Sequence, residues 1–413
     1  MDGVRAVGVD GSPRSVSDLT VALRAALDGV GPAVLPVRAH PGAEPPLPEP
    51  VARAARDGLP DGLAVVVATS GSTGEPKHVG LTAGALRASA AATENRLGGP
   101  GRWLLTLPAE HVAGVQVVLR ALLAGAEPVV QDVRDGFRPD GLARATGRLP
   151  HGARRYTSLV PTQLARVLDQ GSAPLHALAG YAAVLVGGAA LDPGLRSRAE
   201  EAGVRVVTTY GMSETCGGCV YDGVPLDGVR VSLEPGSGRV VLGGPVVAAG
   251  YLGAPAATAE AFGPDGFRTT DLGHVAPDGT LTVLGRADDV VNTGGEKVAP
   301  AAVERALTGL PGVRAACVVG LPDDEWGQVV AALIVLADPA GSPGPSSPAG
   351  STGPTGDPGD PGDAVLREAV HRACGRAAVP RVLHRASLVP ERGIGKPDRE
   401  AVADLLARTR PAG

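Results

Sequence analysis

Short apolar runs alternate with helical patterns over the first half of the chain, and this alternation restricts the fold more than any other feature. The runs that predict strands are "LAVVVA", "RWLLTLP", "EPVVQ", "AAVLVG" and "VRVVTTYG", whereas "QVVLRALLAG" and "PTQLARVLDQ" have the pattern of helices. Strands that alternate with helices form parallel sheets covered by helices. The first half of the chain is therefore expected to be an α/β structure.

The second half of the chain changes in character twice. After about Gly236, short strands and turns such as "GRVVLGG" and "GTLTVLGR" follow one another, and a smaller mixed α+β unit begins at Arg286. A chain of 413 residues is too long for one core. We therefore predict a large N-terminal domain, residues 1–285, and a small C-terminal domain, residues 286–413. Within the second domain, Pro, Gly and Ser dominate residues 338–363, and this composition predicts a disordered insertion.

The composition argues against several classes of function. The formal net charge is −5 and no basic stripe stands out, which disfavours a nucleic-acid partner. The longest apolar stretch, residues 113–130, is interrupted by Arg120 and Glu127 and cannot span a bilayer. No signal-peptide pattern opens the chain, so a cytoplasmic location is expected. The only Cys-x-x-Cys pair, Cys216 and Cys219, lacks a second pair with which to form a zinc site, and two buried thiols are the simpler interpretation.

A Gly/Ser/Thr-rich segment, "TSGSTGEPKHVGLT", begins at Thr69 and directly follows the apolar run "LAVVVA". Backbone N–H groups freed by glycines, together with hydroxyls and an ammonium group, form a cradle for phosphate oxygens. The segment is not a Walker A loop, which ends Gly-Lys-Ser/Thr, because Lys77 lies between Pro76 and His78. The lysines of the chain are Lys77, Lys297 and Lys396. Each lies in a Gly-rich context in a chain that otherwise uses arginine, which indicates a geometric demand for an ammonium group.

Six motifs in a fixed order carry a resemblance to a known superfamily. Besides the loop, they are "VGGAAL", "TYGMSET", "TTDLG", "GRADDVVNTGGEKV" and a final "GIGK" that ends at Lys396. Their order resembles that of the adenylate-forming superfamily of acyl-CoA synthetases, luciferases and peptide-synthetase adenylation domains. The resemblance implies a large domain with a distorted β-barrel-like subdomain, a small mobile C-terminal domain and a reaction in two steps. A carboxylate attacks the α-phosphate of ATP to give acyl-AMP and pyrophosphate, and a thiol then displaces AMP.

The resemblance also implies roles for individual residues of the N-terminal domain. The loop would hold the β- and γ-phosphates, Tyr210 would lie against the adenine, and Asp271 would bind the ribose hydroxyls. Glu214 matches the acidic residue that binds Mg²⁺; a helix-capping glutamate is the alternative interpretation. The residues implied for ATP and AMP are Thr69, Ser70, Gly71, Ser72, Thr73, Gly74, Lys77, Gly188, Ala189, Tyr210, Gly211, Met212, Ser213, Asp271 and Arg286.

Three further roles fall in the predicted small domain. Lys396 matches the mobile lysine that bridges the carboxylate and the α-phosphate during adenylation, where its charge offsets the repulsion between two anions. Asp288 falls at the hinge about which the small domain rotates. The pantetheine tunnel for coenzyme A would be lined by Gly294, Gly295, Glu296 and Lys297.

Three longer segments indicate the substrate. "LPAEHVAGVQVVLRALLAG", "RRYTSLVPTQLARVL" and "YGMSETCGGCVYDGVPLDGV" resemble the o-succinylbenzoate–CoA ligase branch of the superfamily, which serves menaquinone biosynthesis. The resemblance assigns catalytic roles to Lys396, Glu214 and His111, the last of which would contact the reacting carboxylate. The second carboxylate, on the ring, needs hydrogen-bond donors, and the candidates are Arg155, Ser158, Thr162 and Gln163. A surface arginine and a helix N-cap are the alternative interpretations of these residues. The residues implied for the substrate are His111, Arg155, Ser158, Thr162, Gln163, Gly217 and Gly218.

Two other functions stay open: another aryl- or acyl-CoA ligase, and a stand-alone adenylation enzyme that loads a carrier protein. A non-catalytic nucleotide-binding module is disfavoured because Lys396 and Glu214 are both present. The chain departs from the superfamily pattern in two places, since only 68 residues precede the phosphate loop and Thr270 replaces a glycine. The expected partners are o-succinylbenzoate, ATP and coenzyme A, with Mg²⁺ as cofactor. No nucleic acid and no membrane insertion are expected, and a homodimer is left open.

Overall fold

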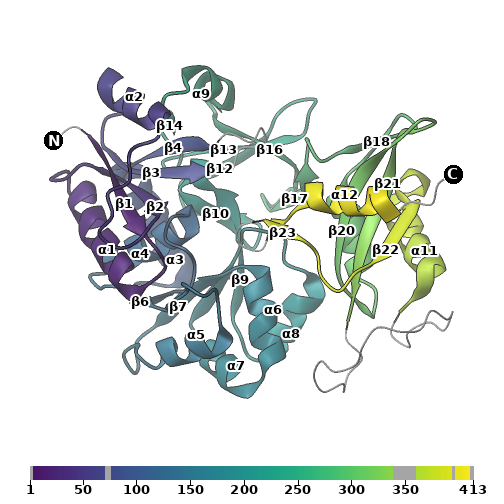
Figure 1. The fold of residues 1–413 in the computed structure, drawn as a ribbon, viewed down its shortest axis with the longest axis horizontal. Helices are drawn as coiled ribbons and strands as arrows, with labels where there is room; N and C mark the ends of the chain where they lie inside the picture. Colours follow the sequence, from purple (N-terminus) through teal and green to yellow (C-terminus); the bar gives the residue numbers. More distant parts are fainter. Residues whose placement is uncertain (1–2, 70–75, 338–359, 393–395, 410–413) are drawn as a thin grey trace. The chain divides into compact units, whose positions relative to one another are not determined.

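The structure is a computed structural model that describes residues 3–69, 76–337, 360–392 and 396–409. The chain forms two compact units (Figure 1). Unit 1 contains Met1–Leu191, Leu195–Thr269 and His274–Thr282, and unit 2 contains Asp192–Gly194, Thr270–Gly273 and Val283–Gly413. The predicted domain boundary after residue 285 falls at the end of strand β17 (Leu281–Arg286) and stays a prediction. No helix in the described ranges is long and apolar enough to cross a membrane.

The first sheet of unit 1 carries the phosphate loop. Its strand order is β1-β2-β3-β4-β14. Strands β1 (Val4–Val9), β2 (Ala33–Arg38) and β3 (Leu63–Thr69) are parallel, whereas β4 (Lys77–Thr82) and β14 (Gly250–Tyr251) continue the sheet in antiparallel pairs. Helices α1 (Pro13–Leu27) and α2 (Glu49–Asp57) pack against these strands. The apolar run that predicted a strand is β3, and its central residues are fully buried.

The second sheet of unit 1 has seven strands, in the order β11-β10-β9-β8-β7-β5-β6. From β6 to β9 the strands are parallel, and β10 runs antiparallel to β9. This confirms the parallel sheet that the sequence predicts. The strands are β5 (Arg102–Leu105), β6 (Val129–Val130), β7 (Arg155–Leu159), β8 (Ala183–Val186), β9 (Val206–Met212), β10 (Gly217–Tyr221) and β11 (Val224–Pro225).

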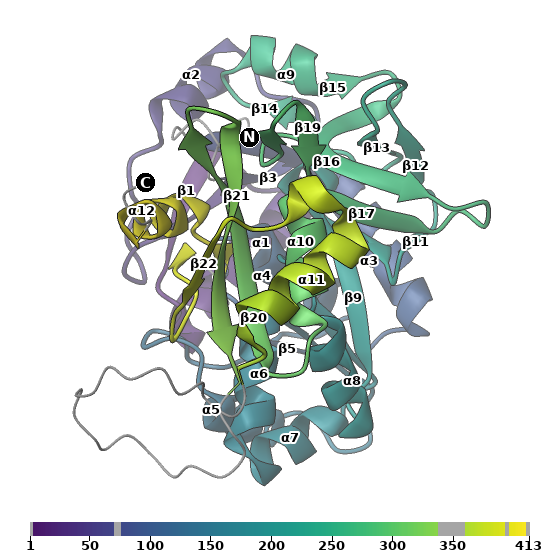
Figure 2. The same cartoon turned by 90° about the vertical axis from the view of Figure 1, so that its right-hand side faces the viewer.

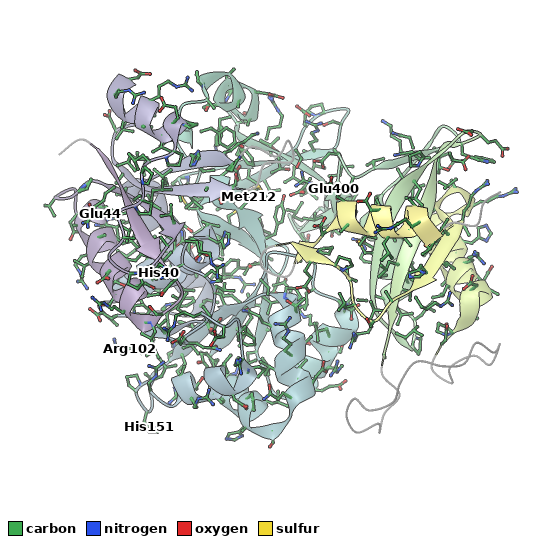
Figure 3. The ribbon with its side chains drawn as sticks, viewed as in Figure 1. His40, Glu44, Arg102, His151, Met212 and Glu400 are labelled. Carbon is green, nitrogen blue, oxygen red and sulfur yellow. The ribbon has the colours of Figure 1, made fainter. Side chains whose placement is uncertain are left out.

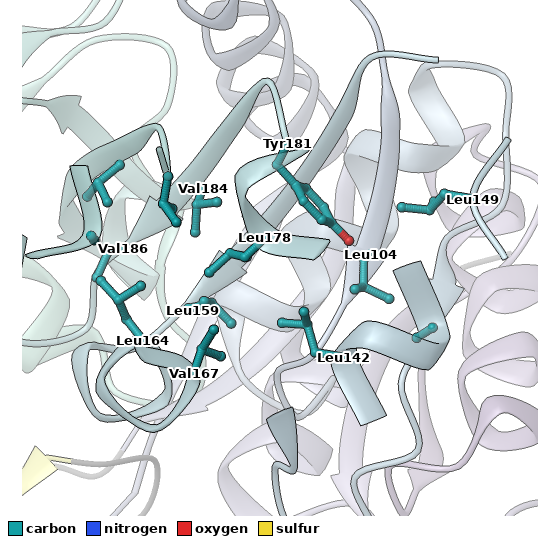
Figure 4. Close-up of a cluster of buried hydrophobic side chains, with 14 residues drawn as sticks. Leu104, Leu142, Leu149, Leu159, Leu164, Val167, Leu178, Tyr181, Val184 and Val186 are labelled. Carbon is teal, nitrogen blue, oxygen red and sulfur yellow. The ribbon is translucent and has the colours of Figure 1, made fainter. Parts of the chain in front are cut away.

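A core of buried leucines and valines fixes the position of this sheet (Figure 4). Leu142, Leu164 and Leu178 come from three helices and meet Leu159 and Val184 of the strands, and none of the five is more than 1% exposed. Each such burial stabilises the fold by about 1.5–3 kcal/mol. The helices of this part of unit 1 are α3 (Ala83–Leu97), α4 (Val112–Leu123), α5 (Pro139–Thr146), α6 (Pro161–Gln170), α7 (Ser172–Ala179) and α8 (Pro193–Glu201).

The segment after residue 229 forms the predicted run of short strands. A third sheet has the order β12-β13-β16-β15, in which β12 and β13, and β15 and β16, form antiparallel pairs. Helix α9 (Pro255–Ala261) lies between β14 and β15 in the chain. The strands are β12 (Arg230–Leu233), β13 (Arg239–Gly243), β15 (Phe262–Gly263) and β16 (Gly266–Val275).

Unit 2 is a small sheet with a hydrophobic core on each face. The sheet order is β19-β18-β21-β20, and β22 adds to β21 in parallel. Helices α10 (Pro300–Thr308) and α11 (Gly362–Cys374) supply one core, and α12 (Arg399–Thr409) supplies the other (Figure 2). The strands are β18 (Val291–Thr293), β19 (Glu296–Val298), β20 (Val313–Asp323), β21 (Gly327–Leu336), β22 (Val382–Arg385), β23 (Glu391–Arg392) and β24 (Lys396–Pro397).

The predicted disordered insertion, residues 338–363, lies for the most part outside the described residues. Its last four residues are described and belong to the folded part of unit 2, and for the rest the insertion stays a prediction. Gly362 begins helix α11, and the carboxylates of Asp360 and Asp363 form ion pairs with Arg385. These ion pairs hold the start of α11 against β22, a tertiary contact that composition alone does not reveal.

Candidate active site

The carboxyl ends of the parallel strands bring several predicted site residues to one edge of the seven-stranded sheet. His111 is the N-cap residue directly before α4, Ser158 lies near the end of β7, Gly188 follows β8, and Tyr210 lies in the C-terminal half of β9. In open α/β sheets this edge is where ligands bind. These four predicted site residues therefore lie at the same edge of the sheet, although they are far apart in the sequence.

Close backbone contacts shape this edge. A Cβ atom at Gly187 would collide with Thr209 of the neighbouring strand, so β8 must end in a glycine beside β9. Gly211 has φ +154°, and a side chain there would collide with the carbonyl of Gly217 on β10. Gly188 (φ +82°) and Ala189 follow β8 and are exposed. The close approach of β8, β9 and β10 therefore fixes the backbone next to the predicted adenine-binding residues.

The phosphate loop is framed by the β3–β4 hairpin. Thr69 and Lys77 are direct partners across the two strands, and the hydroxyl of Thr69 donates a hydrogen bond to the carbonyl of Lys77 at 3.3 Å. The loop residues that the sequence assigns to phosphate binding, Ser70, Gly71, Ser72, Thr73 and Gly74, lie outside the described residues. The structure therefore positions the two ends of the loop.

A tyrosine that the sequence analysis did not identify connects the loop with Glu214. The Nζ atom of Lys77 lies 4.8 Å from the centre of the Tyr251 ring, a distance typical of a cation–π contact. The hydroxyl of Tyr251 donates a hydrogen bond to Oε1 of Glu214 at 2.9 Å. Burial raises the pKa of Tyr251, and the nearby carboxylate of Glu214 raises it further, so the phenol keeps its proton and remains a donor.

The backbone around Glu214 is held by its neighbours. Glu214 lies in a short 3₁₀ helix, Ser213–Thr215, and is 9% exposed. The hydroxyl of Thr215 accepts a hydrogen bond from the amide of Met212 at 3.0 Å, and the amide of Ala248 donates to the carbonyl of Glu214 at 2.9 Å. The carboxylate is therefore presented from a rigid turn, which suits a group that must bind a ligand in a fixed position.

Glu214 is a hard oxygen donor of the type that Mg²⁺ prefers. Among the residues that the structure describes, no three His, Cys, Asp or Glu side chains gather closely enough to hold a metal ion. The Cys-x-x-Cys pair is buried, and burial raises the pKa of Cys219 to about 12, so neither a metal nor a redox role is indicated.

The residues predicted to bind the substrate divide into those near the carboxyl ends of the strands and Arg155, which lies at the amino end of its strand. Gln163 is buried and connects the segment before α6 with the segment after β5. Its Oε1 atom accepts a hydrogen bond from the amide of Val160 at 3.1 Å, and its Nε2 atom donates one to the carbonyl of Thr106 at 3.3 Å. Thr162 precedes it in the first turn of α6. Arg155 is the first residue of β7, opposite Arg102 at the start of β5, and donates to the carbonyl of Pro150.

Arg155 thus lies at the amino end of its strand, whereas the other candidates lie at the carboxyl end. Figure 3 labels Arg102, which pairs with Arg155, and Met212, which ends β9; the two lie well apart on unit 1. We therefore leave Arg155 out of the proposed substrate site. Gly217 and Gly218 remain candidates, and a Cβ atom on Gly217 would come within 3.3 Å of Gln116 on α4.

In unit 2, the predicted hinge residue and the predicted ribose arginine form an ion pair. The Nε and Nη2 atoms of Arg286 donate to the two carboxylate oxygens of Asp288 at 2.8 and 2.5 Å. This hydrogen bonding raises the pKa of Arg286, and the charge of Asp271 adds to the effect. The three residues assigned to ribose binding and to the hinge therefore interact electrostatically within one unit.

A cluster of ion pairs surrounds Arg399, three residues after the predicted catalytic lysine in the chain. Arg399 forms ion pairs with Asp289 at 3.1 Å and with Glu304 of α10 at 2.7 Å. It also donates to the carbonyl of Val318 on β20 at 2.6 Å. Lys396 lies in β24, which pairs with β23, and its side chain is outside the described part of the chain.

The predicted coenzyme A loop is the tight turn between β18 and β19. Gly294 and Gly295 have φ of +58° and +83°, which glycine adopts without strain. The amide of Gly294 donates to the carbonyl of Trp326 at 3.0 Å, and a Cβ atom on Gly294 would press against the Trp326 ring at 2.5 Å. The guanidinium of Arg381 lies 4.4 Å from the centre of that ring. Trp326 and Arg381 were not identified from the sequence, because they become neighbours of the loop only in the folded unit.

Two family descriptions match the chain. The AMP-binding enzyme family matches residues 32–252, and the AMP-binding enzyme C-terminal domain matches residues 302–396. The chain is 45% identical over 393 residues to a probable 2-succinylbenzoate–CoA ligase of Mycobacterium tuberculosis, and this match covers 94% of the chain and 95% of the relative.

Solved structures share the fold. The amide bond synthetase McbA from Marinactinospora thermotolerans superimposes with a TM-score of 0.72 at 26% identity, covering 98% of this chain and 80% of that one. An o-succinylbenzoate CoA synthetase from Bacillus subtilis, in complex with its acyl-adenylate intermediate, gives a TM-score of 0.69 at 21% identity, with 100% of this chain and 88% of that chain covered. The expected architecture of a large α/β domain and a small C-terminal domain is confirmed by these likenesses.

Proposed function

The chain belongs to the AMP-binding enzyme family, and from this premise we propose that it is an AMP-forming acid–thiol ligase that acts on o-succinylbenzoate. ATP and o-succinylbenzoate would give o-succinylbenzoyl-AMP and pyrophosphate. Coenzyme A would then displace AMP to give o-succinylbenzoyl-CoA, a step of menaquinone biosynthesis. The observation that carries the substrate assignment is the 45% identity, over nearly the whole of both chains, to a probable 2-succinylbenzoate–CoA ligase.

The β3–β4 hairpin supports the role of the loop in holding the leaving group. Thr69 and Lys77 fix its two ends, and Lys77 brings an ammonium group to the start of β4. The contact of Lys77 with the Tyr251 ring restricts its flexible side chain before a nucleotide binds. We propose that Lys77 binds the β- and γ-phosphates and stabilises the negative charge that builds up as pyrophosphate leaves.

Glu214 is the residue proposed to hold Mg²⁺. Its hydrogen bond from Tyr251 occupies one side of the carboxylate and orients it, as partners of metal ligands commonly do. When bound, the ion would neutralise charge on the phosphate oxygens. Tyr251 keeps the carboxylate in position, and the rigid 3₁₀ turn keeps the backbone in position.

The remaining roles follow the edge of the seven-stranded sheet. His111, at the start of α4, is proposed to contact the reacting carboxylate, and Tyr210 to lie against the adenine together with Gly188 and Ala189. Ser158, Thr162, Gly217 and Gly218 are proposed to line the substrate site, with Gln163 as the brace of its loops. The proposed setting is the cytoplasm, with small molecules as partners.

The substrate assignment predicts a clear order of activities. We expect o-succinylbenzoate to be converted faster than benzoate or a medium-chain fatty acid, because a site that hydrogen-bonds a second carboxylate penalises acids that lack it. The measurement is acid-dependent release of AMP in the presence of ATP and coenzyme A, across this panel of acids. Equal or faster turnover of the fatty acid would contradict the substrate and leave the ligase chemistry in place.

Trp326 supplies a prediction for the second half-reaction. Because its ring packs on Gly294 of the proposed coenzyme A loop, we expect Trp326→Ala to raise the KM for coenzyme A by about tenfold, in line with the loss of an aromatic contact. Release of pyrophosphate in the absence of coenzyme A should stay near the wild-type rate. The matched control is Trp326→Phe, which keeps a ring against the glycine. If both variants lose adenylation, Trp326 supports the fold of unit 2 instead.

A further inference from the structure

A cavity of about 250 Å³ lies in unit 1 at the amino ends of the strands of the seven-stranded sheet. Its walls come from α3, from the start of β5, from the start of β7 and from the last turns of α4. They include Ala91, Glu94, Trp103, Arg120 and Tyr156. Trp103 and Tyr156 are register partners in the first half of their strands, so the cavity is separated along the strands from the edge that carries the candidate active site.

Arg120 is the unusual member of this cavity. It is only 7% exposed, and its Nε atom has no hydrogen-bond partner. Its Nη2 atom donates to the hydroxyl of Tyr221 at 3.2 Å, and its guanidinium lies 5.3 Å from the centre of the Trp103 ring. No ion pair between residues that the structure describes involves Arg120, and its two direct partners, Tyr221 and Trp103, are neutral, although Arg87 and Glu94 line the same cavity.

A buried charge without a counter-ion is costly, because its desolvation is not repaid by an attraction to an opposite charge. Tyr221 and Trp103 offset part of this cost through a neutral hydrogen bond and a cation–π contact. An anion in the cavity would supply the missing counter-charge and a charge-assisted hydrogen bond. The cavity is open to such an occupant, since Arg120 itself lines it.

The other walls indicate the shape of the occupant. Trp103 and Tyr156 lie with ring centres 5.0 Å apart, and Trp103 also faces the guanidinium. Aromatic side chains in the wall favour an aromatic ligand, because aromatic rings pack together in offset and edge-to-face arrangements. The volume lies below the roughly 300–1,000 Å³ of pockets for drug-sized molecules, which restricts the ligand to about a single ring.

We propose that this cavity is a second binding site, for a small planar carboxylate of about the size of benzoate, with Arg120 as the counter-charge. Glu94 lines the same cavity and carries a like charge to the ligand. It limits the affinity of the site for anions. The site therefore binds monocarboxylates weakly, and removal of the Glu94 charge strengthens the binding.

The chain offers its own reporter for this site. Its two tryptophans are Trp103 and Trp326, so a Trp326→Phe background leaves Trp103 in the cavity wall as the only tryptophan. The experiment is a fluorescence titration of this protein with benzoate, in the presence of saturating AMP to occupy the nucleotide part of the proposed active site. We expect a saturable change in Trp103 emission with benzoate and little change with benzamide, which has the same shape and no charge.

Three variants in the same background complete the test. Arg120→Met should weaken benzoate binding by about tenfold or more, the loss expected for a charge-assisted hydrogen bond. Glu94→Gln should strengthen it, and Ala91→Leu should block it by filling the cavity without any change of charge. Circular dichroism checks that each variant folds; if Arg120→Met does not fold, the other two still decide. Equal binding of benzoate and benzamide, or benzoate binding that none of the three changes, would overturn the proposal.

Discussion

Replacement of Lys396 by alanine is expected to slow the formation of acyl-adenylate by ~100-fold or more, the range for the loss of one preorganised charge contact. The reason is that the carboxylate and the α-phosphate are both negative and must approach each other. Coenzyme A should still consume chemically synthesised acyl-adenylate at nearly the wild-type rate. Lys396→Arg should restore little, because the planar guanidinium is bulkier and spreads its charge.

Single-turnover assays of each half-reaction measure this difference. The matched control is Lys297→Ala, which removes a lysine from the proposed coenzyme A loop and should affect the thioester step instead. The two lysines belong to different sheets of unit 2, since Lys297 lies in β19 beside β18 and Lys396 lies in the separate β23–β24 pair. Equal damage to both half-reactions by Lys396→Ala would mean that the residue supports the fold of unit 2.

A second large effect is expected at Glu214. Glu214→Gln keeps the size of the side chain and can still accept the hydrogen bond from Tyr251, but it loses the charge that attracts Mg²⁺. We expect adenylation to fall by ~100-fold or more, as for the loss of a stabilised transition-state charge. The measurement is the rate of pyrophosphate release as a function of the Mg²⁺ concentration, with the melting temperature recorded alongside.

Tyr251→Phe is the comparison that separates binding from orientation. It leaves the carboxylate charged and removes only the 2.9 Å hydrogen bond, so a loss of about tenfold is expected. High Mg²⁺ should rescue Tyr251→Phe and should not rescue Glu214→Gln. A large fall in melting temperature for Glu214→Gln, with both half-reactions reduced alike, would support the alternative interpretation that Glu214 only stabilises its turn.

The sequence predicts the strands well where the local pattern is strong. The run "LAVVVA" is β3, and "AAVLVG" contains β8, because buried parallel strands need continuous apolar residues. The order of the motifs also predicts which residues meet at the carboxyl edge of the second sheet. It does not predict the position of Arg155 along its strand relative to the site, because a polar residue at either end of a short strand gives the same local pattern.

Other features arise only from contacts between distant segments. Tyr251 reaches Glu214 because β14 pairs with β4, and nothing in the local sequence of either residue indicates this pairing. Trp326 reaches Gly294 because β18 pairs with β21. The ion pair between Asp360 and Arg385 of β22 is likewise a contact that the local composition does not reveal.

The Arg399 cluster has a mechanical consequence for the proposed rotation of the small domain about Asp288. Arg399 ties Asp289, the next residue after the hinge position, to α10 and β20, and it lies only three residues after Lys396. These contacts connect the backbone that follows Lys396 with the backbone beside the proposed hinge, so the two segments are expected to move together. The angle of rotation of the small domain then determines where Lys396 is placed. Little conformational entropy is lost in ordering the backbone of Lys396 at each catalytic cycle. The position of Lys396 relative to the α-phosphate would then depend on the rotation about Asp288, and not on independent motion of the segment that carries the lysine.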